Sequence, residues 1–226
     1  MGQESSTFAG TDYLLRVGRS SGEGNCSGIK TDGDLSAYCW GVLMAVDLRA
    51  KTIEQCYLVP GQTWPVELGW LYDNISLSKS HAEIGVYCGR SLLASCAGMN
   101  KFSEVVAVDD ASMWVNRQWV DKVQLATLEL IHPNISINNL RMNSIDAARE
   151  CERLKCKFDS VFIDGCHEYA ECKADIHAWM ALLKPGGLIC GHDYWPVHIG
   201  VMDAVNEVFQ GRHSVISGTR IWCFRV

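Results

Sequence analysis

The sequence lacks the features that would place the protein in a membrane, in a secretory pathway or on a nucleic acid. No apolar stretch is long enough to span a bilayer. Residues Met1–Gly10 contain no basic segment followed by an apolar run, so we expect no signal peptide. Lysine and arginine number 20 against 26 aspartates and glutamates, and the formal net charge of −6 argues against a dedicated nucleic-acid binder.

Eleven cysteines are present, yet none of them forms a Cys-x-x-Cys pair, so neither a zinc site nor a disulfide framework is indicated. Cys88, Cys96 and Cys190 lie within apolar patterns, where a small buried thiol is ordinary. Together with the missing signal peptide, this predicts reduced thiols in a cytoplasmic protein. Hydrophobic residues make up 48% and charged residues 20%, which is enough for a sizeable core.

The 226 residues divide into an irregular first part, 1–78, and a regular second part, 79–226. In the first part, Arg19–Gly33 is rich in glycine and serine and reads as a loop. Helices are expected over Leu35–Leu48 and around Val66–Tyr72. No internal repeat is visible.

Short apolar runs alternate with helical patterns throughout the second part, and the Pro-Gly-Gly at 185–187 is expected to end a helix. This alternation predicts an α/β fold: a Rossmann-like, doubly wound, mostly parallel seven-stranded sheet with a C-terminal antiparallel hairpin. The expected strands are 81–86, 104–108, 135–137, 160–163 and 188–190 with a hairpin over 213–226, and the expected helices are 91–97, 115–130, 144–154, 170–183 and 201–209.

Ligands of such sheets bind beyond the carboxyl ends of the strands, and polar residues and glycines gather at these ends here. Gly85 and Gly89 flank a strand–helix turn in which the backbone can approach a ligand closely. Their Gly-x-x-x-Gly spacing differs from the Gly-x-Gly-x-x-Gly of nicotinamide enzymes, so an oxidoreductase is the weaker interpretation. Isolated glycine pairs are also common in turns without any ligand.

Five polar side chains at or just after later strand ends are candidates for chemistry. Asp109 can accept ribose hydroxyls, or it can be a solvated turn residue or helix cap. Asp164, His192 and Asp193 follow two strands expected to be neighbours, and the pattern leaves a divalent cation and no metal equally open. His167, on the loop after Asp164, is a candidate general base, or else a surface histidine.

Taken in order, these motifs resemble the class I S-adenosylmethionine-dependent methyltransferases. Within that class they look like the subgroup of macrocin and catechol O-methyltransferases, over roughly residues 80–226. The motifs are Glu83-Ile84-Gly85-x-x-x-Gly89-Arg90-Ser91, Val106-Ala107-Val108-Asp109, Phe162-Ile163-Asp164-Gly165-x-His167-x-Tyr169, Trp179-x-x-Leu182-Leu183-Lys184-Pro185-Gly186-Gly187, Gly191-His192-Asp193-Tyr194 and Gly218-Thr219-x-x-Trp222.

The resemblance implies that S-adenosylmethionine is the cofactor. The Gly85–Gly89 loop would wrap its methionine part, Glu83 would reach its amino group directly or through water, Asp109 would hold the ribose, and Asn143 and Ser144 would border the adenine. The implied cofactor contacts are Glu83, Gly85, Tyr87, Gly89, Ser91, Asp109, Asn143, Ser144 and Asp164.

The resemblance also implies O-methylation of a small hydroxylated molecule, with His167 and Asp164 as catalytic residues. In metal-dependent relatives, magnesium is held at the positions of Asp164, His192 and Asp193, but a histidine departs from the oxygen ligands that magnesium prefers. Residues 1–78 would supply a lid or substrate wall, with Trp40, Trp64 and Trp70 in that wall or in the core. The alternative is a methyltransferase-like protein that binds a ligand or partner without catalysis. The sequence leaves open whether the chain forms a homo-oligomer.

Overall fold

The computed structural model describes residues 48–99 and 102–226. The loop expected over Arg19–Gly33, Trp40, and all but the last residue of the helix expected over Leu35–Leu48 lie outside these residues. Residues Asp47–Val226 form one compact unit. No described helix has the length and apolar character needed to cross a membrane.

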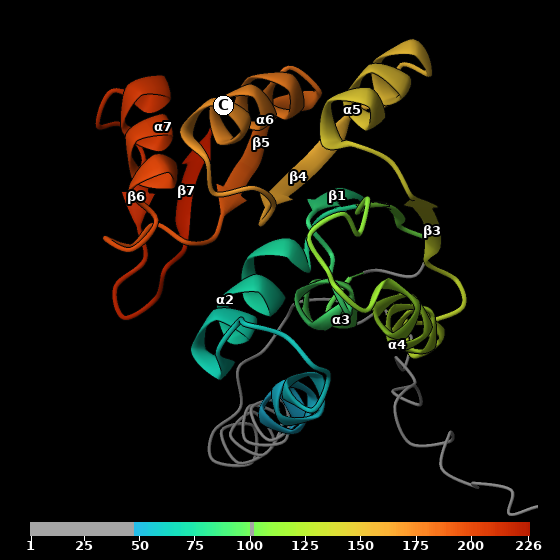
Figure 1. Ribbon diagram of the computed structural model, residues 1–226. Helices are drawn as coiled ribbons and strands as arrows, with labels where there is room; N and C mark the ends of the chain where they lie inside the picture. The colour runs from blue at the N-terminus through green and yellow to red at the C-terminus, as the bar shows by residue number, and fades with distance from the viewer. Residues whose placement is uncertain (1–47, 100–101) are drawn as a thin grey trace, which may run out of the picture. The chain divides into compact units, whose positions relative to one another are not determined.

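A seven-stranded sheet forms the centre of this unit, in the order β3-β2-β1-β4-β5-β7-β6 (Figure 1). The strands β1 to β5 run parallel, whereas β7 is antiparallel to both β5 and β6. This confirms the predicted fold class. The strands are β1 Ser80–Ile84, β2 Glu104–Val108, β3 Ser136–Leu140, β4 Phe158–Ile163, β5 Leu183–Gly191, β6 Ser214–Val215 and β7 Trp222–Arg225.

Helices cover both faces of the sheet, as Figure 1 shows. The helices α2 (Pro65–Ile75), α3 (Arg90–Ala97) and α4 (Arg117–Glu129) pack on one face. On the other face lie α5 (Ser144–Arg153), α6 (Tyr169–Met180) and α7 (Ile199–Phe209). A further helical stretch, 48–57, precedes α2.

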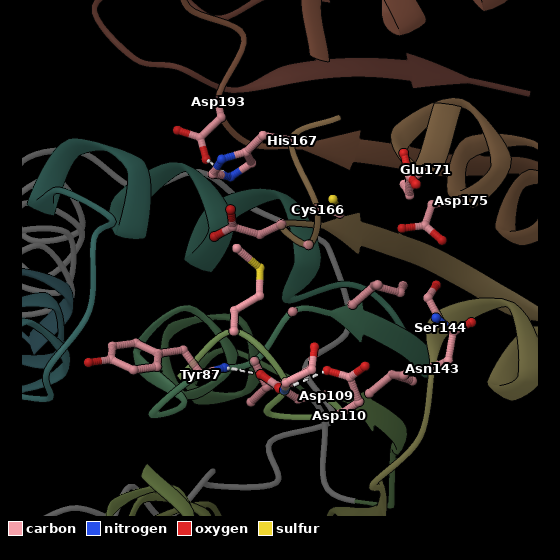
Figure 2. Close-up of a pocket in the computed structure, with 18 of the residues that line it drawn as sticks. Tyr87, Asp109, Asp110, Asn143, Ser144, Cys166, His167, Glu171, Asp175 and Asp193 are labelled. Carbon is pink, nitrogen blue, oxygen red and sulfur yellow. Dashed lines mark hydrogen bonds and ion pairs between the residues drawn. The ribbon is translucent and has the colours of Figure 1, made fainter. Parts of the chain in front are cut away.

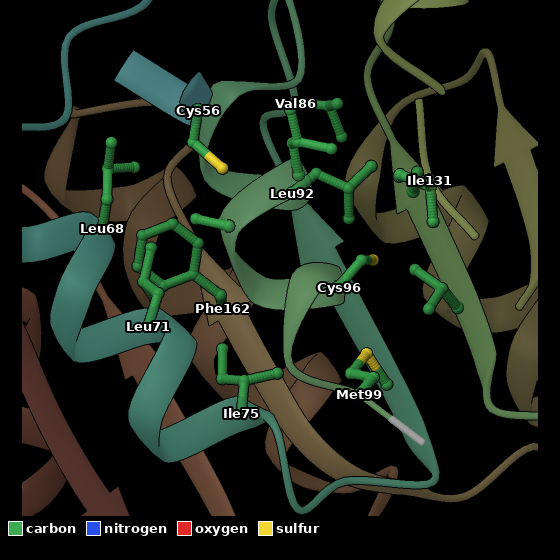
Figure 3. Packing of buried hydrophobic residues seen from close by; sticks show 14 of the residues in the cluster. Cys56, Leu68, Leu71, Ile75, Val86, Leu92, Cys96, Met99, Ile131 and Phe162 are labelled. Atoms are coloured by element: carbon green, nitrogen blue, oxygen red, sulfur yellow. The ribbon is translucent and has the colours of Figure 1, made fainter. Parts of the chain in front are cut away.

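Two hydrophobic clusters fill the spaces between the sheet and these helix layers. In β2, Val105 and Ala107 belong to the cluster under α2, α3 and α4, whereas Val106 and Val108 belong to the other. The alternation follows from the two-residue period of a strand, and burial on both faces explains why this strand is apolar throughout. Figure 3 shows the first cluster, where Leu71 and Ile75 of α2 lie near Phe162 of β4.

The largest difference from the sequence prediction lies between α6 and β5. The helix expected over 170–183 ends at Met180, and Pro185–Gly187 lies within β5 instead of ending the helix. The backbone N–H of Phe158 already donates to the Leu182 carbonyl at 2.9 Å, so the chain pairs with β4 from this point. The register between β4 and β5 shifts between Phe158 and Ser160, which accommodates the proline and two glycines.

Candidate active site

A cavity of about 680 Å³ opens at the carboxyl ends of β1, β2, β3 and β4 (Figure 2). This volume is within the range of pockets that bind cofactors and drug-sized ligands. The loop of residues 60–63, before α2, adds a further wall. The predicted cofactor contacts that line it are Gly85, Tyr87, Ser91, Asp109, Asn143, Ser144 and Asp164, together with His167 and Asp193.

The backbone geometry of the turn between β1 and α3 requires glycine at both positions, whether or not a ligand binds there. Gly85 has φ +85, and a side chain there would overlap the carbonyl group of Asp164 and come within 2.8 Å of the Gly165 nitrogen. Gly89, which does not line the cavity, has φ +90, and a Cβ would meet the Thr127 methyl at 3.0 Å. Both positions therefore need glycine for backbone conformation and close packing, while Gly85 also forms part of the cavity wall.

Asp109, directly after β2, holds two backbone segments beside the cavity in place. Its two carboxylate oxygens accept the backbone N–H groups of Tyr87 and Ala111, both at 2.6 Å. The Tyr87 ring packs against Trp114 with ring centroids 4.0 Å apart, and both residues line the cavity. A carboxylate oxygen has a second lone pair, so Asp109 can still accept from a ligand hydroxyl. The neighbouring Asp110 also lines the cavity.

Glu83 is not part of the cavity lining. It is fully buried in β1, on the side covered by α3, where its Oε1 accepts the Ser91 hydroxyl at 2.7 Å. Burial raises the pKa of this carboxyl. Only Ser91 of this pair lines the cavity, so contact between Glu83 and a cofactor would have to pass through Ser91.

Asn143 and Ser144 begin α5 at another side of the cavity. Asn143 caps the helix, since its Oδ1 accepts the Ile145 N–H at 2.9 Å. The Ser144 hydroxyl accepts the indole N–H of Trp179 at 2.8 Å. Nearby Asp175 also lines the cavity, and burial raises its pKa to about 6.

His167 and Asp193 face each other at the end of the cavity nearest β5 (Figure 2). His167 Nε2 lies 2.8 Å from Asp193 Oδ2, and this contact raises the pKa of His167. Burial alone would raise the pKa of Asp193, but the adjacent His167 and His192 bring it far below its usual range. Asp193 has φ +58, an uncommon conformation for a side-chain-bearing residue outside turns. The pair has the geometry of a histidine base oriented by a carboxylate.

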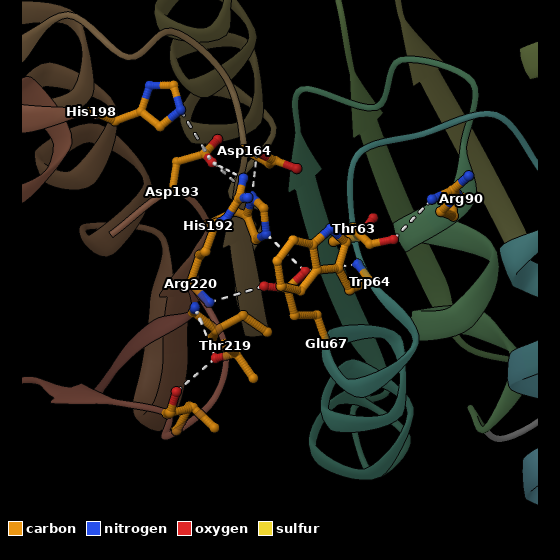
Figure 4. A network of polar contacts seen from close by, with 12 residues as sticks. Thr63, Trp64, Glu67, Arg90, Asp164, His192, Asp193, His198, Thr219 and Arg220 are labelled. Carbon is orange, nitrogen blue, oxygen red and sulfur yellow. Dashed lines mark hydrogen bonds and ion pairs between the residues drawn. The ribbon is translucent and has the colours of Figure 1, made fainter. Parts of the chain in front are cut away.

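His192, also at the end of β5, lies between carboxylates on both of its ring nitrogens (Figure 4). Its Nε2 is 3.1 Å from Glu67 Oε2, while its Nδ1 is 3.2 Å from Asp193 Oδ1 and 3.6 Å from Asp164 Oδ1. Burial by itself lowers the pKa of His192, but the carboxylates outweigh it and raise the pKa to about 10. Burial raises the pKa of Asp164 to about 6.

The three expected metal ligands, Asp164, His192 and Asp193, do meet, with ligand atoms within 4.8 Å of one another. The set does not fit magnesium, however. That ion prefers oxygen ligands, and here one of the three donors is an imidazole nitrogen. Both ring nitrogens of His192 are buried and each already faces a carboxylate. These side chains therefore do not form a magnesium site.

Sequence reasoning missed three residues of this end of the site. Glu67 comes from α2, and Arg220 and His198 lie within 3.7 Å and 3.6 Å of Asp193. Glu67 did leave a signal: it precedes Leu71 and Ile75 by four and eight residues, so a carboxylate shares the buried face of an amphipathic helix. Nothing in the local sequence marks Arg220 or His198.

Residues 82–194, half of the chain, match a protein-family model described as a methyltransferase domain. The chain belongs to this methyltransferase family. Together with the strand order and the cavity at the carboxyl ends, this makes it a class I, S-adenosylmethionine-dependent methyltransferase, as the motifs had indicated. A comparison with curated proteins finds no match.

Solved structures with the same fold include several methyltransferases. An O-methyltransferase from Bacillus cereus in complex with SAH is 17% identical, with a TM-score of 0.58 over 85% of this chain and 97% of that chain. The SAH-bound Podospora anserina methyltransferase PaMTH1 is 12% identical, with a TM-score of 0.57 over 88% and 98%. A putative caffeoyl-CoA O-methyltransferase from Staphylococcus aureus is 16% identical, with a TM-score of 0.56 over 82% and 98%. At these identities the likeness concerns the fold.

Proposed function

We propose that this methyltransferase transfers the methyl group of S-adenosylmethionine to a hydroxyl of a small molecule, with His167 as the general base. The observation that carries the proposal is the 2.8 Å contact between His167 Nε2 and Asp193 Oδ2 at one end of the cavity. The O-methyltransferases among the solved structures with this fold support the choice of a hydroxyl acceptor.

The reaction needs little beyond alignment and one proton transfer. The acceptor oxygen attacks the sulfonium methyl carbon, the carbon–sulfur bond breaks with its electron pair on sulfur, and the hydroxyl proton moves to His167. Asp193 holds Nε2 of the imidazole, which leaves Nδ1 to take the proton. The cavity holds the reacting groups together and limits their contact with water.

The cofactor is proposed to lie along the strand ends, with its ribose at Asp109, its adenine beside Asn143 and Ser144, and its methionine part near Gly85 and Tyr87. All of these residues line one cavity, which supports the placement.

Within the predicted 1–78 segment, residues 60–63 are proposed as part of the substrate wall. Arg90 supports this wall, because its side chain donates to the carbonyls of Val59 at 2.5 Å and Thr63 at 2.9 Å. Trp64 and Trp70 do not line the cavity.

The experiment is a turnover assay with the purified full chain, S-adenosylmethionine and a panel of small hydroxylated compounds, with S-adenosylhomocysteine measured by mass spectrometry. His167→Gln is expected to lower kcat by about 10²- to 10⁴-fold, the usual contribution of a general base, while the Kd of S-adenosylmethionine stays within about twofold. His177→Gln, which changes an exposed histidine of α6, is the matched control and should retain full activity.

Two results would contradict the proposal. If calorimetry detects no binding of S-adenosylmethionine at millimolar concentration, the cofactor assignment fails. If His167→Gln turns over as fast as the wild type, the assignment of the base fails.

A further inference from the structure

The end of the cavity beside β5 concentrates negative charge around one imidazole. Glu67, Asp164 and Asp193 reach it from α2, β4 and β5, and His192 lies among them (Figure 4). The side chains of His192 and Glu67 are each 1% exposed, and those of Asp193 and Asp164 are 6% and 21% exposed. Three carboxylates this close would repel one another strongly without a positive charge between them.

Glu67 in particular needs such a partner. Its Oε2 accepts the Trp64 N–H at 2.7 Å, its Oε1 accepts the Arg220 N–H at 2.9 Å, and its side chain has almost no access to solvent. These two donors fix the carboxylate in place, but neither carries a charge. A buried carboxylate without a cationic partner is strongly destabilising. Among the described residues, His192 is the only cationic side chain within 4.0 Å of either Glu67 or Asp164.

With Asp164 and Asp193, His192 is one of the three residues at which the family resemblance implies a divalent cation, and their ligand atoms lie within 4.8 Å of one another. Arg220 and His198 approach Asp193 at 3.7 Å and 3.6 Å, but only His192 contacts all three carboxylates. His192, directly after β5, therefore supplies the positive charge among these carboxylates that a bound ion would otherwise supply.

We propose that His192 takes the place of the divalent cation, as the internal counter-charge of Glu67, Asp164 and Asp193, and that methyl transfer by this enzyme needs no metal. The inference rests on the proposed function above, since it concerns the same reaction. His192 is a positioning residue: it holds Asp193, which in turn orients His167, and it holds Glu67 and with it the start of α2.

This arrangement predicts that a single substitution creates a metal site. His192→Asp removes the imidazole and leaves four carboxylates, from Glu67 and from residues 164, 192 and 193, around the vacated space. Magnesium prefers oxygen ligands and is usually held by one or two carboxylates together with waters, so these carboxylates are enough to hold it. The wild type should be indifferent to magnesium, whereas the variant should depend on it.

The experiment uses the full chain, freed of any histidine tag and dialysed against EDTA, with three measurements. Mass spectrometry of metals is expected to find less than one tenth of an equivalent in the wild type, and turnover in EDTA should stay within about twofold of turnover in 10 mM MgCl₂. The Tm of the wild type should not respond to MgCl₂, whereas that of His192→Asp should rise by roughly 5–10 °C when MgCl₂ exceeds its Kd about 100-fold.

His177→Asp makes the same substitution at an exposed position of α6 and should show no response to MgCl₂. Should His192→Asp fail to fold, His192→Asn tests the same charge: its Tm should lie below that of the wild type and should not recover in MgCl₂. The metal content of the wild type requires no variant at all.

Stoichiometric metal in the wild type, or a tenfold loss of turnover in EDTA that a divalent cation restores, would overturn the proposal. A folded His192→Asp whose Tm ignores MgCl₂ would overturn it as well. Failure of the proposed function has a different signature: the wild type would not bind S-adenosylmethionine, while the metal-content and Tm measurements would still report on His192.

Discussion

Replacing Gly85 by alanine tests how strictly the turn after β1 is built. At φ +85, an alanine costs about 1–2 kcal/mol in backbone strain alone. Its Cβ would also overlap the carbonyl of Asp164, whose N–H donates to the Ile84 carbonyl at 2.7 Å and so fixes the two strand ends together. Forcing these ends apart adds about 1–3 kcal/mol, as overpacking in a filled core does.

Gly186→Ala is the matched control for this prediction. Gly186 has φ +78, close to that of Gly85, but a Cβ there would meet nothing within 4 Å. The two variants therefore share the strain, and only Gly85→Ala adds the overlap. Gly85→Ala should melt about 3–10 °C below Gly186→Ala in a thermal unfolding experiment. Because Gly85 and Asp164 both line the cavity, it should also weaken binding of S-adenosylmethionine, measured by calorimetry, whereas the control should not. Equal Tm values and equal affinities for the two variants would refute this account of the turn.

Two further predictions concern the ends of the cavity. Asp109→Asn should raise the Kd of S-adenosylmethionine by about 10- to 100-fold, because hydrogen bonds to a charged group contribute about 1.5–3 kcal/mol. Asp110→Asn should raise this Kd less. If Asp110→Asn had the larger effect, the ribose contact would belong to Asp110 instead. Asp193 raises the pKa of His167, and only the neutral imidazole accepts a proton, so kcat/KM should rise with pH and level off above that raised pKa. Asp193→Asn should move this rise to lower pH, and an unchanged pH profile would show that His167 is not the group that titrates.

The sequence was sufficient to predict the order of strands and helices wherever burial on both faces made a strand continuously apolar. The strand β2 is predicted to the residue, whereas β3, expected at 135–137, runs over Ser136–Leu140. Asn138 and Asn139 continue that strand, and they are tolerated because β3 lies at the edge of the sheet and is only partly buried. A prediction based on apolar runs therefore ends such an edge strand too early.

The candidate site was predictable as a set of strand ends, but the directions of its side chains were not. Glu83 shows the difference. It alternates with Ala82 and Ile84, which pack on the face of α5, α6 and α7, so its own side chain must point to the face that α3 covers. Neither its place near the end of β1 nor its charge reveals that it is buried behind Ser91.

Partners from distant parts of the chain were the hardest to foresee, and they decide the chemistry of His192. Read alone, the Gly-His-Asp segment after β5 suggests an imidazole with a free nitrogen, which can bind a metal. The structure adds Glu67, 125 residues earlier and outside the matched methyltransferase domain, on the second ring nitrogen. A carboxylate on one nitrogen alone would orient a metal-binding histidine, but carboxylates facing both nitrogens favour a protonated ring. The segment before the family domain therefore takes part in the electrostatics of this end of the cavity, because it supplies Glu67.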